Sequence, residues 1–204
     1  MRITSVRLTL IIAISVLGSR LTAQNYGCQA GKNSQQLPPL YYCAENLRSD
    51  TFDILKYTIN LEIGNSITKL IKGNTAVRFA PKLNNRTFIR LDLLKLTIDS
   101  VKESLTTLTY TYNDTILKIN FTAAKNTIDT STITVYYKGI PQGDPAGWGG
   151  FYFDNHGGNQ YAYNLGVGFG AKPHNYGRVW FPCFDNFVER SKYEFNITSH
   201  QIKR

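Results

Sequence analysis

Histidine, cysteine and methionine are scarce in this sequence of 204 residues, and their scarcity excludes several kinds of catalytic site. None of the three histidines, His156, His174 and His200, is followed by glutamate, and none has a second histidine four residues away. A zinc site of the His-Glu-x-x-His type is therefore absent from these residues. The sequence also contains no Gly-x-Ser-x-Gly nucleophile motif, no phosphate-binding glycine loop and no Cys-x-x-Cys pair. We expect neither catalytic residues nor metal ligands in this chain.

Long apolar runs are also missing, apart from one segment of about ten residues at Leu8–Leu17. That segment is too short to cross a bilayer as a helix, follows the basic residues Arg2 and Arg7, and precedes the small residue Ala23. This pattern predicts a signal peptide over residues 1–23; the alternative, an N-terminal membrane anchor, needs a longer run. We expect an exported protein, periplasmic, cell-surface or extracellular, without a stable membrane span.

Acidic residues are too few to balance the basic ones, since 14 Asp and Glu face 23 Lys and Arg and the net charge is +9. Three arginines and no acid lie in the predicted signal peptide, and subtracting them leaves +6. The remaining basic residues are scattered along the predicted strands, as on a solvated face. Nucleic-acid binding requires a clustered basic stripe, so we expect no nucleic-acid partner.

The three cysteines fall into two groups. Cys28 and Cys43 lie close together in a polar leader loop over residues 24–49, and an exported chain allows a disulfide between them. Lipidation of Cys28 is a weak alternative, because the preceding residues are a poor signal and lie far from the apolar run. Cys183 stands between bulky apolar residues and is interpreted as a buried thiol.

Alternation of apolar and polar residues dominates from residue 50 onward and predicts an all-β fold. The clearest example is the strand from Tyr57 to Ile63. A second strand would run through Ile71 to Phe79 with a bulge at Gly73, and Pro81 would end it. Further strands are expected at residues 88–93, 96–101, 105–112, 115–121, 132–137 and 193–197, with a tight hairpin at residues 113–114. We expect residues 50–204 to form one antiparallel β-sandwich or curved open sheet.

Residues 143–170 differ from the rest in composition, because nine of the sixteen glycines fall there among many aromatic residues. Glycine allows sharp turns, and aromatic rings supply flat contact area. Two interpretations stay open: a surface that meets a ligand or a neighbouring domain, or tight hairpin turns whose aromatic side chains belong to the core. The candidate docking or ligand face consists of Trp148, Phe151, Tyr152, Tyr161, Tyr163 and Phe169.

The most specific segment of the chain is the run Arg178-Val179-Trp180-Phe181-Pro182-Cys183-Phe184-Asp185. Proline fixes φ and lacks an N–H donor, so the chain should leave the sheet at this point. The two phenylalanines of the run can anchor the turn in the core. A buried pair of Arg178 with Asp185 would specify the geometry of the turn more than it stabilises it.

This run resembles the signature near the end of the N-terminal β-domain of the aminopeptidase N family of zinc metallopeptidases. In that family an arginine precedes a Phe-Pro-Cys-Phe-Asp run and a strand follows. Residues 53–57 look like the domain's opening strand, and Lys138-Gly139 and Gly150-Phe151-Tyr152 look like the turns that precede the signature. The similarity covers about residue 49 to the C-terminus.

The resemblance implies a non-catalytic domain that docks on a catalytic domain and walls the cleft of an enzyme that removes N-terminal residues from peptides. Zinc is expected in the full-length enzyme, because the zinc motif and the substrate motif Gly-x-Met-Glu-Asn follow the β-domain in the family. We therefore expect a truncated sequence, with the domain incomplete at its C-terminal edge. Gly170 stands where family members often place a Glu or Gln that holds the substrate amine. The alternatives are a stand-alone exported module that binds glycans or peptides, and an inactive paralogue.

Overall fold

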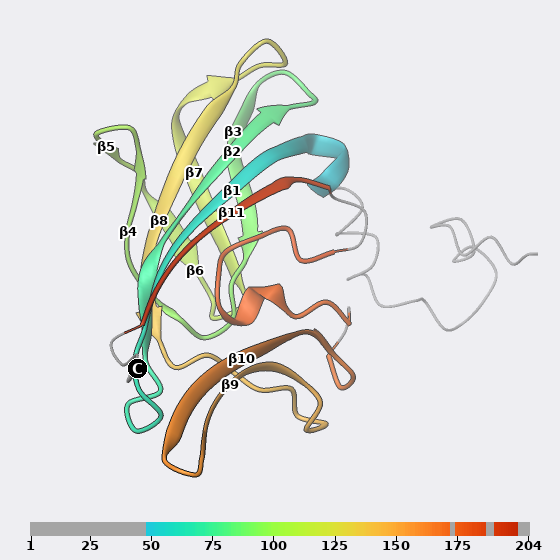
Figure 1. Ribbon diagram of the computed structural model, residues 1–204. Helices are drawn as coiled ribbons and strands as arrows, with labels where there is room; N and C mark the ends of the chain where they lie inside the picture. Colours follow the sequence, from blue (N-terminus) through green and yellow to red (C-terminus); the bar gives the residue numbers. More distant parts are fainter. Residues whose placement is uncertain (1–47, 172–173, 187–189, 200–204) are drawn as a thin grey trace, which may run out of the picture. The chain divides into compact units, whose positions relative to one another are not determined.

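The computed structural model describes residues 48–171, 174–186 and 190–199 (Figure 1). The predicted signal peptide, nearly all of the leader loop, Cys28, Cys43 and His200 lie outside these residues. Within the described ranges, no helix is both long enough and apolar enough to cross a membrane.

The described residues form eleven strands, a helical turn over residues 48–51 and a short 3-10 helix. The strands are β1 (Phe52–Ile63), β2 (Ile71–Pro81), β3 (Arg86–Asp92), β4 (Thr97–Glu103), β5 (Thr106–Thr107), β6 (Tyr110–Tyr112), β7 (Ile116–Lys125), β8 (Ser131–Gly139), β9 (Gly149–His156), β10 (Asn159–Gly168) and β11 (Lys192–Ser199), and the 3-10 helix is η2 (Gly177–Val179). The all-β class predicted from the alternating pattern is confirmed.

The strands form a six-stranded sheet in the order β11-β1-β2-β8-β4-β5, a three-stranded sheet in the order β3-β7-β6, and the separate hairpin β9-β10. All pairings are antiparallel except that of β11 with β1, which is parallel and places Tyr193 beside Tyr57. The expectation of a purely antiparallel sheet is therefore wrong at this edge. A short turn forces the two strands of a hairpin to pair in antiparallel fashion. Strands β1 and β11 are far apart in the sequence and are not joined by such a turn, so they can pair in parallel.

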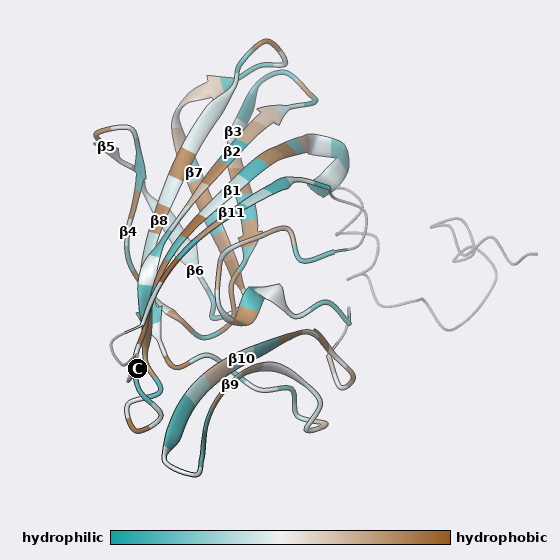
Figure 2. Cartoon of the chain, viewed as in Figure 1, coloured by the Kyte–Doolittle hydropathy of each residue, from teal (hydrophilic) through white to brown (hydrophobic). Residues whose placement is uncertain are grey.

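The core lies between the two larger sheets. Tyr57, Ile59 and Leu61 of β1 are buried, as their period-two spacing predicts. The ring of Phe121 in β7 stacks on Phe79 of β2 with centroids 5.5 Å apart, which joins the three-stranded sheet to the six-stranded one. Hydrophobic positions recur along β1, β7 and β8 in Figure 2. The two sheets thus form a sandwich around one apolar cluster.

Gly73 does not form the predicted bulge. The register of β1 with β2 runs without interruption past Gly73, which faces Leu61, and the irregularity falls between Ile54 and Lys56 instead. A Cβ atom on Gly73 would lie 2.0 Å from the carbonyl oxygen of Asn60. Glycine is needed at position 73 because the backbone of β1 approaches it closely. A close backbone approach and a bulge are two separate reasons for a glycine inside a strand.

The single strand predicted for residues 105–112 is also wrong, because this segment is divided between β5 and β6 in different sheets. Leu105 is exposed, whereas Leu108 turns into the core and its N–H donates to the carbonyl of Val101 at 2.9 Å. The tight turn predicted at residues 113–114 is confirmed. The Asn113 side-chain oxygen accepts a hydrogen bond from the Ile116 N–H at 2.7 Å, and Asp114 has a φ of 66°.

Candidate functional site

The signature run is fastened to the end of β3 by backbone hydrogen bonds. The Asp92 N–H donates to the Cys183 carbonyl at 2.7 Å, and the Cys183 N–H donates to the Asp92 carbonyl at 3.1 Å. At the beginning of the signature run, the carbonyl of Arg178 in η2 accepts a hydrogen bond from the Leu94 N–H at 2.7 Å. The segment that contains Pro182 is therefore held to the sandwich at both ends.

Two arginines and two aspartates form a buried network around this segment. Arg178 contacts the Asp185 carboxylate at 3.1 Å, and the pair predicted from the sequence is present with side chains 9% and 6% exposed. Asp185 also accepts from the Gly177 N–H at 3.0 Å and donates its own N–H to the Asp92 carboxylate at 3.0 Å. Asp92 in turn binds Arg48 at 2.9 Å. Because every carboxylate here has a cation, the network satisfies its buried charges internally.

Burial is the main cause of the pKa changes of Asp185 and of the neighbouring Cys183. It raises the pKa of Asp185 to about 6; Arg178 opposes this change and the neighbouring Asp92 charge adds to it. Burial also raises the pKa of the Cys183 thiol, with Asp185 and Asp92 contributing in the same direction. Cys183 is therefore a protonated core thiol, as predicted, and not a thiolate nucleophile.

The aromatic residues of the signature anchor it to the six-stranded sheet. Phe181 and Phe184 are buried, and the Phe181 ring meets Tyr57 edge-on at 5.8 Å. The Tyr57 hydroxyl accepts a hydrogen bond from the Phe184 N–H at 2.9 Å. Trp180, half-buried, stacks on Phe195 of β11 at 5.9 Å. The signature thus joins β1, β3 and β11, a structural role for all its large side chains.

The hairpin β9-β10 has one packed face and one open face. Phe151 and Phe153 lie on the packed face, where the Phe151 ring is 6.1 Å from Trp180. On the other face, Tyr163 stacks with Tyr152 at 5.3 Å and with Tyr161 at 6.0 Å. The hairpin therefore links the signature on one side to a row of tyrosines on the other.

The six aromatic residues proposed as a docking face are divided by the structure. Phe151 belongs to the core, with 6% of its surface exposed, because its place on β9 points it inward. Trp148 and Phe169 are 67% and 66% exposed, and Tyr161 and Tyr163 lie on the open face of the hairpin, next to the half-buried Tyr152. The core interpretation therefore holds for Phe151, while an interaction surface stays a prediction for the exposed side chains.

Two further apolar residues extend the open face, and sequence reasoning missed them. Tyr161, Tyr163, Leu165 and Val167 alternate along β10, and each is between 40% and 45% exposed. Their spacing by two residues was a signal in the sequence, since residues two apart share one face of a regular strand. The pairing of β10 with β9 is regular from Tyr161 to Leu165 and shifts register between Leu165 and Gly168. We call these four residues the β10 row.

Asp144 organises the glycine-rich loops and was also missed. Its carboxylate is buried and accepts hydrogen bonds from the Gly170 N–H, at 2.9 Å for one oxygen, and from the Ala146 N–H at 3.3 Å. A Cβ atom on Gly170 would lie 3.2 Å from the other Asp144 oxygen. An acidic side chain at position 170 would start next to the Asp144 carboxylate, and the two negative charges would repel each other. This repulsion is a physical reason for glycine at this position.

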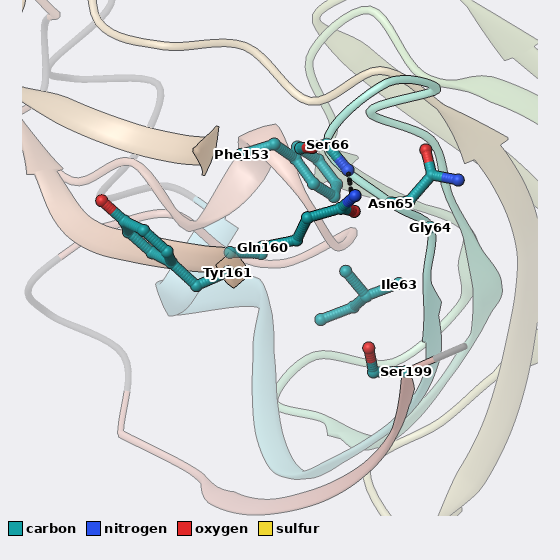
Figure 3. A pocket seen from close by; sticks show the side chains of 9 residues that line it. Ile63, Gly64, Asn65, Ser66, Phe153, Gln160, Tyr161 and Ser199 are labelled. Carbon is teal, nitrogen blue, oxygen red and sulfur yellow. Dashed lines mark hydrogen bonds between the residues drawn. The ribbon is translucent and has the colours of Figure 1, made fainter. Parts of the chain in front are cut away.

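A small cleft of about 220 Å³ lies between the β1–β2 turn and the hairpin (Figure 3). Gln160 extends from β10 toward the turn, and its side-chain oxygen accepts a hydrogen bond from the Ser66 N–H at 3.1 Å. Ile63, Phe153 and Ser199 complete much of the wall. The described lining contains no carboxylate, histidine or cysteine, which are the usual side-chain ligands of zinc.

Within the described residues, no three side chains of His, Cys, Asp or Glu lie close enough together to hold a metal ion. His156 is exposed at the end of β9, and the Nδ1 atom of the exposed His174 lies 3.0 Å from the Gly168 carbonyl oxygen. The residues that the structure describes do not fit a zinc site.

No model of a known protein family matches the sequence, and no curated protein matches it. Solved structures do match the fold. One is an M1 zinc metallopeptidase from Deinococcus radiodurans, with a TM-score of 0.58 and 16% identity over 73% of this chain and 32% of the other. Another is leukotriene A4 hydrolase from Saccharomyces cerevisiae, with a TM-score of 0.59 and 18% identity over 76% of this chain and 24% of the other.

This chain has a fold found in M1 zinc metallopeptidases. The resemblance stated from the signature is confirmed at the level of the fold. A third match is described as a two-domain M1 zinc metallopeptidase bound to L-tryptophan, with a TM-score of 0.58 and 16% identity over 73% of this chain. The matched region spans about a third of the Deinococcus protein and a quarter of the yeast enzyme.

Proposed function

We propose that this chain is the non-catalytic N-terminal β-domain of an exported zinc aminopeptidase. In the complete enzyme it would dock on the catalytic domain and form one wall of the cleft where N-terminal residues are removed from peptides. The likeness to M1 zinc metallopeptidases supports the family context, and those chains are three to four times longer than the region matched here. The position of the domain against a catalytic partner is our inference.

The β10 row is the observation that carries the docking proposal. Tyr161, Tyr163 and Leu165 share one open strand face, and Val167 adds exposed apolar surface beyond the register shift that follows Leu165, while the opposite face of the same hairpin packs on Trp180 through Phe151. Trp148 and Phe169 add two large exposed rings from the adjoining loops. Contiguous exposed apolar surface of this kind marks an interaction site in soluble proteins.

The described side chains of this chain would contribute shape rather than chemistry to the cleft. The zinc ion of the full enzyme would supply an activated water, and its ligands must come from the catalytic domain, because the described residues provide no ligand set. The open face carries one carboxylate near the tyrosines, Asp154, which accepts a hydrogen bond from the Tyr161 hydroxyl at 3.0 Å. The β10 row itself would exclude water and hold the two domains in register.

Self-association of the isolated chain tests the docking face. Without its catalytic partner, the full chain should associate with rising concentration in sedimentation experiments, because the β10 row stays uncovered. Leu165→Ser should weaken this association about tenfold, since it removes apolar contact area. Leu105→Ser is the matched control, because Leu105 is exposed on a turn far from the row in sequence. A strict monomer, or equal effects of both variants, would contradict the docking face.

A stand-alone exported binding module is the second candidate function. The three stacked tyrosines and the exposed Trp148 form flat aromatic surface of the kind that sugar rings or peptides stack on. A monomer whose Trp148 fluorescence changes on adding oligosaccharides would favour this function over docking. An inactive paralogue would instead bind an active homologous enzyme.

A further inference from the structure

A basic pocket of about 380 Å³ lies between the helical turn at residues 48–51 and strand β3. Its lining includes three guanidinium groups, those of Arg48, Arg86 and Arg90, together with the aromatic rings of Phe88 and Phe184. Among the residues that the structure describes, no Asp or Glu lines it. The volume falls in the range of small-molecule sites, and the lining combines apolar surface with a few charged groups, as such sites do.

Each arginine is positioned by a contact with the protein, and for Arg48 and Arg86 the contact includes a residue outside the pocket lining. Arg48 is held by the Asp92 carboxylate at 2.9 Å and lies over the Phe184 ring at 5.7 Å. The Nε–H of Arg86 donates to the Asn84 carbonyl at 3.0 Å. The guanidinium of Arg90 lies over the Phe88 ring, 5.0 Å from its centroid. The three groups are thus arranged before any ligand arrives, which lowers the entropic cost of binding one.

Among the described residues, no acidic side chain pairs with the arginines at the β3 side of the pocket. In the described part of the chain, neither Arg86 nor Arg90 has a carboxylate within 4.0 Å, whereas Lys125 is paired with Glu103 at 2.6 Å and Lys138 with Asp99 at 2.7 Å. Arg90 also faces Lys118 directly across the β3–β7 ladder.

Like charges opposite each other destabilise a sheet. The Lys118 ammonium lies 4.5 Å from the same Phe88 ring that carries Arg90, so two cations share one aromatic surface. The cluster therefore works against the stability of the three-stranded sheet, and a bound anion would relieve the repulsion.

We propose that this pocket binds a small organic anion through its carboxylate or phosphate groups. Arg86 and Arg90 would provide paired N–H donors, because the planar guanidinium fork matches both oxyanion geometries. Arg48 would stay bound to Asp92, so that this pair presents no net negative charge to the anion. The site is separate from the β10 row and does not depend on the docking proposal.

Calorimetric titration of the full chain at constant ionic strength tests this proposal, with citrate as the carboxylate probe and pyrophosphate as the phosphate probe. We expect at least one probe to bind, and Arg86→Gln and Arg90→Gln each to weaken its affinity about tenfold, because each removes charge-assisted hydrogen bonds. The better probe identifies the preferred anion. Arg78→Gln is the control, since Arg78 is an exposed arginine on β2 that does not line this pocket.

Binding that Arg78→Gln weakens as much as the pocket variants would mean general charge attraction and would overturn the site. Absence of binding by both probes would also overturn it. Thermal unfolding of the variants separates these outcomes from misfolding, and we expect melting temperatures within a few degrees of the parent because surface substitutions change stability little.

Discussion

Asp92 and Cys183 lie far apart in the sequence, yet each donates its backbone N–H to the carbonyl of the other, at 2.7 Å and 3.1 Å. This exchange ties the signature run to the end of β3. It also brings the Asp92 carboxylate to the Asp185 N–H, so that the two aspartates and their arginines meet in one buried network. The signature therefore organises this part of the domain.

Arg178→Gln should destabilise the protein by about 3–5 kcal/mol near pH 8, because the buried Asp185 carboxylate would lose its cation. The loss should be smaller near pH 5, where Asp185 can take up a proton instead. Urea unfolding at both pH values measures this. Lys138→Gln is the control: it breaks a pair whose side chains are 47% and 37% exposed, and should cost less than about 1 kcal/mol.

The raised pKa of Asp185 predicts a pH dependence of the free energy of unfolding. The carboxyl ionises near 3.8 in the unfolded chain and at about 6 in the folded one, so the folded state holds the extra proton between these values. The contribution of Asp185 should therefore fall by up to about 3 kcal/mol as the pH rises through this window. Asp185→Asn should remove that slope, and an unchanged slope would count against the assignment.

Cys183 should not react with thiol reagents in the folded protein near pH 8, because it is 2% exposed and its pKa is raised by burial. In denaturant the number of reactive thiols also tests the predicted disulfide. One thiol per chain means that Cys28 and Cys43 are paired, and three mean that they are not. Rapid labelling of Cys183 in the native protein would show that the signature is not packed as described.

Gly73→Ala should destabilise the protein by about 3 kcal/mol or more, because its Cβ would lie 2.0 Å from the Asn60 carbonyl oxygen and the paired backbones must separate. Gly166→Ala is the matched control, since a Cβ there meets no atom within 4 Å. Thermal unfolding of both variants gives the comparison. Equal melting temperatures would mean that β1 and β2 do not approach each other this closely.

Local pattern predicted the strands well where one face is buried and the other is open. The alternation from Tyr57 to Ile63 and the Asn113 turn are examples, because period-two burial and side-chain capping act over a few residues. The Arg178–Asp185 pair was predictable for the same reason, as both residues belong to one short turn.

Long-range pairing was not predictable from the sequence. Nothing near Asp92 indicates that it meets Cys183 and Arg48, and the parallel edge formed by β11 depends on a strand distant from β1 in sequence. Gly73 shows the same limit, since a bulge and a close backbone approach both favour glycine and only the neighbouring strand distinguishes them. Asp144 was missed because its hydrogen-bond partner, Gly170, lies in another loop.

The central claim is that these residues form the first domain of a zinc aminopeptidase. The most direct test is the size of the native protein in its source cells, detected with an antibody raised against residues 48–199. The account predicts a species at least about twice the 23.1 kDa of this chain, because the matched structures extend far beyond the shared fold. A species near 23.1 kDa would contradict it and would mean that the domain acts alone.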